Sequence, residues 1–85
     1  MGSEDLRQLK PDKVVDARGV ACPGPLLEAK RVMAEVPPGG ILEVLSSDEG
    51  TKDDLPLWAE NAGHEFLGVI EEAGYWRLFV RKAAE

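Results

Sequence analysis

The sequence has few of the residues from which metal and redox sites are built. Its 85 residues include one cysteine and one histidine, and aromatic residues make up 6% of them. A single cysteine cannot form an internal disulfide, and with one histidine it cannot complete a zinc cluster. We therefore expect no metal centre, and we expect no cofactor. Redox or transfer chemistry at the thiol would need a second molecule.

Positive charge and long apolar runs are also scarce. Lys and Arg number 10 against 16 Asp and Glu, so the formal net charge is −6. Proteins that bind nucleic acid directly usually carry a basic stripe, and we expect no such binding here. No apolar run approaches the roughly 20 residues that cross a membrane, and the acidic start at residues 1–5 is unlike a signal peptide. We expect a cytoplasmic protein that does not act on a membrane.

The length bounds the organisation of the chain. A chain of 85 residues can bury one small core but cannot enclose a deep active site, so its chemistry should occur at its surface. Residues 1–12 are polar and lack strand alternation, and we expect them to form a flexible N-terminal tail. Residues 13–85 are expected to form a single domain, which we expect to be a monomer.

Apolar periodicity and turn residues predict six regular elements. The expected strands are residues 13–17, 41–45, 64–71 and 75–82, and the expected helices are residues 23–36 and a segment that opens near Thr51 and is closed by Gly63. The almost wholly apolar run at 41–45 is typical of an inner strand. This order predicts an α/β (α+β) fold, a two-layer sandwich in which a mixed four-stranded sheet carries two helices on one face.

The second helix has conflicting signals at its start. Thr51 is expected to cap it, with Asp54 in the capping-box position, but Pro56 then lies beyond the first turn. We expect either a kink at Pro56 or a loose opening turn, with the regular helix starting near Leu55. The expected buried stripe consists of Leu55, Trp58, Ala59 and Ala62, with Trp58 as a core anchor.

The last strand divides its side chains between the two faces of the sheet. Trp76, Leu78 and Val80 are expected to face the helices. The other face, which we expect to be partly open, should carry Tyr75, Arg77, Phe79 and Arg81. The only histidine, His64, is far in sequence from the cysteine, and we expect it to have a structural role.

The cysteine lies in the segment Cys22-Pro23-Gly24-Pro25, between the first strand and the first helix. Proline fits the first helical turn, where backbone N–H groups have no partner within the helix. Cys22 is therefore expected at or next to the helix start, where the helix dipole and free N–H groups favour a thiolate. We expect an accessible, nucleophilic sulfur. The alternative is a buried cysteine that acts only as a small apolar residue.

These residues resemble the TusA/SirA-like family of sulfur carriers, whose signature is Cys-Pro-X-Pro a few residues after an Asp and a Gly. Here the Asp and the Gly are Asp16 and Gly19. The similarity continues through 40–45, 47–50, 54–56 and 62–65 to Arg81-Lys82, and it covers nearly the whole chain from about Lys13. The fold that this resemblance implies is the one predicted above.

The resemblance implies that Cys22 takes a sulfane sulfur from a persulfide donor protein, such as a cysteine desulfurase or a rhodanese-like enzyme, and relays it to an acceptor protein. Such a protein is a carrier more than a turnover enzyme. The family serves transfer-RNA thiolation, cofactor synthesis and sulfur oxidation, and some members are linked to thiosulfate or selenium metabolism. The sequence does not choose among these pathways.

Several residues around the cysteine are expected to support it. Pro23 and Pro25 would fix the geometry, and Gly24 would offer a backbone N–H to the sulfur. The cations Arg18, Lys30 and Arg31 would stabilise the anionic sulfur or meet acidic partners; for Lys30 and Arg31 the alternative is ordinary solubilising charge. Asp48 follows the strand at 41–45 and is expected near Cys22, with a role as a turn or capping residue as the alternative.

Two other functions are compatible with the sequence. In the first, Cys22 is a redox sensor that forms a sulfenic acid or a mixed disulfide. In the second, the chain is a small regulatory interaction module whose open sheet face, with Tyr75 and Phe79, is the working surface. Peroxide reactivity without sulfur transfer would favour the sensor, and partner binding that survives loss of Cys22 would favour the module.

Overall fold

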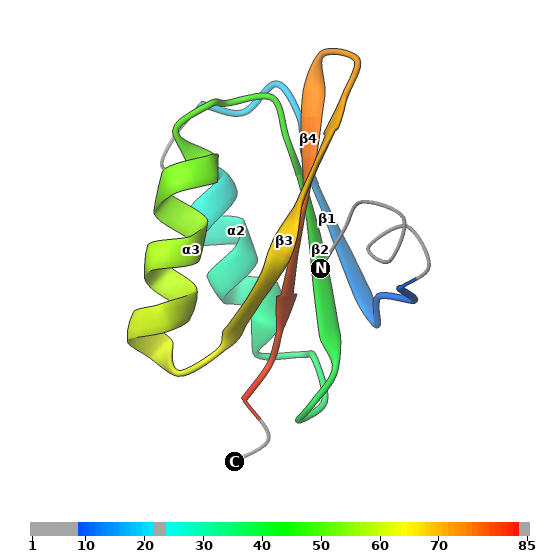
Figure 1. Cartoon of the computed structure of the whole chain (residues 1–85), viewed down its shortest axis with the longest axis vertical. Coiled ribbons are helices and arrows are strands. Elements are labelled where there is room, and N and C mark those ends of the chain that lie inside the picture. The colour runs from blue at the N-terminus through cyan, green and yellow to red at the C-terminus, as the bar shows by residue number, and fades with distance from the viewer. Residues whose placement is uncertain (1–8, 22–23, 84–85) are drawn as a thin grey trace.

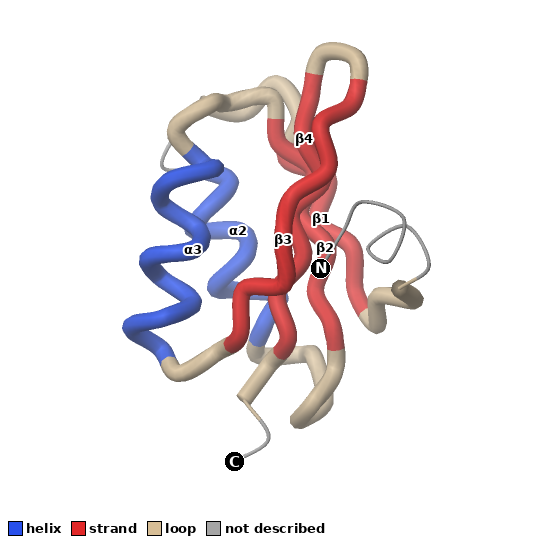
Figure 2. Tube along the Cα trace, in the orientation of Figure 1, coloured by secondary structure: helices blue, strands red, loops and turns tan. Residues whose placement is uncertain are grey.

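A twisted sheet with both helices on one side forms the molecule (Figures 1 and 2). The computed structural model describes residues 9–21 and 24–83. In chain order the elements are β1 (Lys13–Ala17), α2 (Gly24–Met33), β2 (Ile41–Ser46), α3 (Thr51–Ala62), β3 (Glu65–Glu72) and β4 (Tyr75–Arg81). The predicted fold class is confirmed, including the mixed sheet and the two helices on one face.

The strands lie in the order β1-β2-β4-β3. β1 and β2 are parallel and are joined by α2, whereas β4 runs antiparallel to both β2 and β3. β2 is therefore an inner strand, as predicted, and its Leu42 and Val44 are fully buried. A turn at Ala73 and Gly74 closes the predicted β3–β4 hairpin, with Gly74 at a φ of 86°.

The main core lies between the sheet and the helices. α2 packs against β1 and β2, and α3 packs chiefly against β3. The buried residues of this core are Val15, Ala17, Ala29, Met33, Val36, Leu42, Val44, Leu55, Ala59, Leu78 and Val80. Trp58 is half-buried and packs against this core, whereas Ala62, expected in the same buried stripe, is exposed. The prediction for Ala62 was wrong: Ala62 is the last residue of the helix, directly before Gly63, and burial of this face ends at Ala59.

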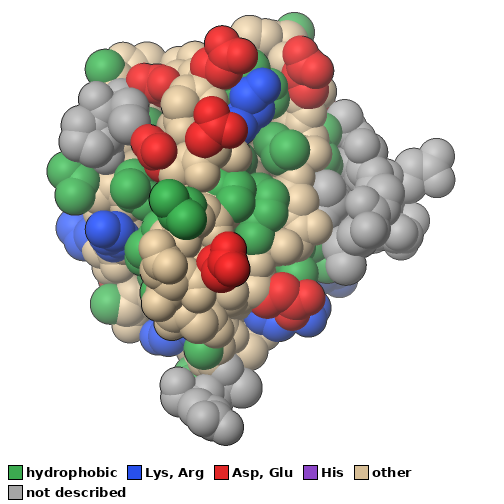
Figure 3. Space-filling view, turned by 60° about the vertical axis from the view of Figure 1, so that its left-hand side comes forward, with side chains coloured by type: hydrophobic (Ala, Val, Ile, Leu, Met, Phe, Trp, Pro, Cys, Tyr) green, Lys and Arg blue, Asp and Glu red, His purple; other side chains and the backbone are tan. Residues whose placement is uncertain are grey.

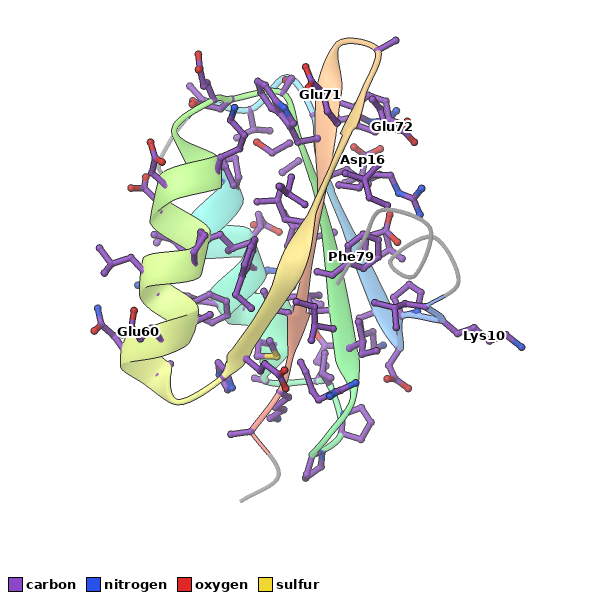
Figure 4. The ribbon with its side chains drawn as sticks, in the orientation of Figure 1. Lys10, Asp16, Glu60, Glu71, Glu72 and Phe79 are labelled. Atoms are coloured by element: carbon purple, nitrogen blue, oxygen red, sulfur yellow. The ribbon has the colours of Figure 1, made fainter. Side chains whose placement is uncertain are left out.

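The second face of the sheet is less open than the alternation predicted. Phe79 is 0% exposed and forms a small second core with Leu67 and Ile70, against which Leu9 and Ile41 pack. A register shift between Phe66 and Gly68 interrupts the alternation of β3 beside Phe79. Phe79 points away from the helices, on the same side of the sheet as Asp16 (Figure 4). Phe79 is thus core and not an open working surface, which corrects the expectation for this residue.

The start of α3 also differs from the prediction. The residue that precedes the helix is Gly50, with no side-chain cap, and Thr51 is the first helical residue. The Thr51 hydroxyl is buried and shares a hydrogen bond of 2.9 Å with Ser46 Oγ, so it is not available to cap the helix. The opening turn is tight, because the N–H groups of residues 51–53 donate to the carbonyls three residues earlier.

The helix contains Pro56 and ends at Gly63, which has the left-handed conformation predicted for it, with a φ of 81°. Because α3 begins at Thr51, the expectation that the regular helix starts near Leu55 was wrong. Across residues 9–21 and 24–83, neither helix has the length and apolar character needed to cross a membrane.

Candidate functional site

The site is built where the parallel strands β1 and β2 end. Ala17 is paired with Ser46, so the loop after β1 (Arg18–Ala21) and the turn after β2 (Ser47–Gly50) leave the sheet at the same edge. They enclose an open hollow of about 190 Å³, lined by Gly19, Val20, Ala21, Ser47 and Asp48. In the sequence, Cys22 follows this loop directly.

One hydrogen bond joins the two segments. The backbone N–H of Gly19 donates to Ser47 Oγ at 2.7 Å. Gly19 has a φ of 82°, a conformation that glycine adopts without a steric cost. Ser47 was not among the residues predicted for the site, although its place directly after a buried strand, at a carboxyl end, was a usable signal.

The start of α2 is shaped by the same loop. The Gly24 N–H donates to the Ala21 carbonyl at 2.8 Å, so it is not free to bind the sulfur, which corrects the expectation for this residue. A Cβ atom on Gly24 would collide with the side chain of Val20. Packing against Val20 therefore explains why glycine stands between the two prolines of the motif. Pro25 is buried in the first turn of α2. The first turn of a helix has free N–H groups and the positive end of the helix dipole.

Cys22 and Pro23 lie outside the described residues, so the exposure and charge of the thiol stay predictions. Because α2 begins at Gly24, the cysteine stands two positions before the first helical residue in the sequence. The described residues contain no group of three metal-ligating side chains.

Asp16 and Arg18 form a closed pair before the loop. Arg18 Nε and Nη2 donate to the two carboxylate oxygens of Asp16, each at 2.9 Å, and the Arg18 backbone N–H donates to Asp16 Oδ1 at 3.2 Å. The hydrogen bonds from Arg18 lower the pKa of Asp16 from 3.8 to about 2. The guanidinium also lies over the Tyr75 ring, 5.0 Å from its centroid. Its charge is already balanced by Asp16, which weakens the expectation that it serves the sulfur.

The other two predicted cations are remote from the loop. Lys30 and Arg31 lie in the last turn of α2, and Lys30 is about 9 Å further along the helix axis than Gly24 at about 1.5 Å per residue. Arg31 pairs with Glu28 at 2.7 Å, and Lys30 faces the groove between α2 and α3. The structure does not bring them to the hollow.

Asp48 does lie at the hollow, and it also acts as a turn residue. Its carboxylate accepts the Gly50 N–H at 2.8 Å, and its own N–H donates to Ser46 Oγ at 3.1 Å. The two readings of Asp48 from the sequence are therefore compatible. The helix side of the molecule exposes apolar side chains between acidic ones (Figure 3). Leu27 on α2 is 57% exposed and Leu57 on α3 is 59% exposed.

The fold and the site define a class of protein: a small α/β sandwich with a loop at the carboxyl edge of two parallel strands, which the single cysteine follows in the sequence, two residues before a helix. A family model described as sulfurtransferase TusA matches residues 13–82. The chain belongs to this family, and the resemblance drawn from the motif is confirmed.

Individual relatives agree with this assignment. A candidate sulfur carrier protein of Archaeoglobus fulgidus is 51% identical over 69 residues, which are 81% of this chain and 94% of that protein. The sulfur carrier protein TusA of Pseudomonas entomophila is 38% identical over 80 residues, 94% of this chain and 100% of that protein. The crystal structure of a SirA-like protein from Desulfitobacterium hafniense, 25% identical, matches with a TM-score of 0.74 over 84% of this chain and 97% of that one.

Proposed function

We propose that this protein is a sulfur carrier that holds a sulfane sulfur as a persulfide on Cys22. The observation that carries the proposal is the match to the TusA family across residues 13–82, within which the Cys-Pro-Gly-Pro motif joins the hollow to the start of α2. The names of relatives such as that of Pseudomonas entomophila support the same role. Donor and acceptor proteins are the partners that this role requires.

The transfer needs no oxidant or reductant beyond the persulfide itself. The Cys22 thiolate attacks the outer sulfur of a donor persulfide, the new sulfur–sulfur bond forms on Cys22, and the donor's inner sulfur leaves as a thiolate. In the second step a nucleophile of the acceptor attacks the outer sulfur, and Cys22 leaves as a thiolate. The electron pair and the charge are conserved in each step, and the proton of the outer sulfur exchanges with water.

The helix start suits both charged forms of the cysteine. Free N–H groups and the positive dipole end of α2 stabilise an anion placed just before Gly24. Pro23 and Pro25 leave no competing N–H at their positions and stiffen the turn. Asp48 contributes to the hollow beside Ala21, and the acidic turn that it belongs to would meet basic partners. The choice of pathway, a cytoplasmic location and a monomeric state remain predictions.

Loading by a cysteine desulfurase tests the proposal. With desulfurase and cysteine, the wild-type protein should gain one sulfur, about 32 Da by mass spectrometry, because the thiolate accepts the sulfur, and Cys22→Ser should gain none. The matched control is Glu60→Gln, on an exposed residue of α3 that points outward from the helix (Figure 4), which should load like the wild type. A Cys22→Ser protein that still takes up sulfur would refute the assignment.

The same samples distinguish a redox sensor. A sensor cysteine would gain oxygen on exposure to peroxide, about 16 Da for a sulfenic acid, and would take no sulfur from the desulfurase. The interaction-module reading required Phe79 on an open sheet face, and its full burial removes that support.

A further inference from the structure

Two neighbouring serines at the end of β2 hold two different segments. Ser46 is fully buried and pairs with Thr51 inside the β2–α3 connection. Ser47, the next residue, is exposed and accepts the Gly19 N–H from the loop after β1. Successive side chains of an extended chain point to opposite sides, which explains why the two serines contact different segments.

The bond to Ser47 is the tie between the loop and its neighbouring turn. Within residues 9–21 and 24–83, the other hydrogen bonds of the loop are local: Arg18 to Asp16, Val20 to Ala17 and Gly24 to Ala21. The Gly19–Ser47 bond reaches across to the β2–α3 turn and links the Arg18–Ala21 loop to it. Loss of this bond would remove one of the constraints on the wall of the hollow that includes Val20 and Ala21.

We propose that Ser47 is a positioning residue for sulfur transfer: its hydroxyl fixes the Gly19 turn and thereby the direction in which the chain enters the cysteine motif. This inference rests on the proposed function. Ser47 acts through the backbone of Gly19 and not on the sulfur itself. Transfer between two proteins requires the attacking sulfur to be aligned within a narrow range, and a displacement of about 1 Å can cost up to about 100-fold in rate.

The chain offers a matched control at the other end of the sheet. The Asp12 carboxylate accepts the Ile41 N–H at 2.9 Å, so it is also an exposed side chain that ties a backbone N–H of a distant segment, 29 residues away against 28 for Ser47. It lies beside the start of β2, whereas Ser47 follows its end. Asp12→Ala therefore removes the same kind of tie without touching the loop.

The experiment compares wild type, Ser47→Ala, Ser47→Thr and Asp12→Ala in two assays: the initial rate of sulfur loading from a cysteine desulfurase, and the pH profile of Cys22 alkylation by iodoacetamide. Ser47→Ala should load about tenfold more slowly, and its alkylation profile should move toward the ordinary thiol value of about 8.5. Ser47→Thr, which keeps the hydroxyl, should stay within about twofold of the wild type, as should Asp12→Ala.

The inference is overturned if Ser47→Ala matches the wild type in both assays, if Ser47→Thr is as slow as Ser47→Ala, or if Asp12→Ala is equally slow. The melting temperatures of all four proteins show whether a variant is destabilised. If the loss of any such tie slowed loading through lower stability, Asp12→Ala would be slow as well. If the wild type itself takes no sulfur, the proposed function fails, and the alkylation profiles still decide whether Ser47 sets the reactivity of the cysteine.

Discussion

Arg77 on β4 donates through Nε to the carboxylate of Glu43 on β2 at 3.0 Å, on the sheet face that carries Phe79. Glu43 is only 6% exposed. Arg77 also donates to Glu72 at 3.5 Å, and its guanidinium lies 5.5 Å from the centre of the Phe79 ring. The hydrogen bond that Arg77 donates to Glu43 raises the pKa of Arg77. On the sheet face without helices, the Arg77 guanidinium therefore covers the Phe79 ring.

Arg77→Ala should lower the free energy of unfolding by about 3 kcal/mol, because it leaves a buried carboxylate without its partner. Arg81→Ala is the matched control, since its pair with Glu65 at 3.3 Å is exposed, and its effect should be below about 1 kcal/mol. Urea denaturation of both variants measures the difference. Equal effects would show that the burial of Glu43 does not depend on Arg77.

The Asp16 carboxyl should titrate with a pKa of about 2 in the folded protein, because Arg18 stabilises its charged form. A lowered pKa in the folded state means that this contribution to stability is present above about pH 4, the unfolded value, and is lost as the pH falls toward 2. NMR titration of the side-chain carboxyl measures it. Arg18→Ala should return the pKa toward 3.8, and an unshifted carboxyl in the wild type would contradict the pairing.

His64 should make stability fall under mild acid. Its Nδ1 accepts the Ala83 N–H at 2.9 Å, so the neutral ring carries its proton on Nε2, and burial, followed by the charge of Lys82, lowers its pKa below 6.5. The unfolded chain therefore binds the proton more readily, and stability declines as the pH falls from about 6.5 through the lowered folded value. Urea denaturation at pH 7.5 and 5.5 should show a smaller difference in His64→Gln than in the wild type.

Cys22 should be alkylated faster than free cysteine at mildly acidic pH, since the helix start stabilises the thiolate. It is the only cysteine of the chain, so iodoacetamide labelling followed by mass spectrometry reports on it alone. The unfolded protein in urea is the internal control and should react like free cysteine. A rate that follows an unshifted thiol in the folded protein would remove the argument from the helix dipole.

The start of α3 shows where reasoning from sequence failed. Thr51 followed by Asp54 is a normal capping signal, but a capping side chain must be free to turn back to its own helix. Here the hydroxyl of Thr51 is held by Ser46, five residues earlier on a different element. The expectation that Phe79 lies on an open face was wrong for a related reason. Alternation along β4 does not reveal that Leu67 and Leu9, from other parts of the chain, cover Phe79.

The sequence by itself determined the order of the elements, the inner place of β2, the hairpin, the left-handed end of α3 at Gly63 and the family, because periodicity, turn residues and a motif are local properties of the chain. Only the tertiary structure decided that Ser47 meets Gly19 and that Lys30 and Arg31 stand away from the hollow. Such contacts depend on which strands lie parallel and on which loops therefore emerge at one edge. That pairing arises from long-range packing, which no local pattern encodes.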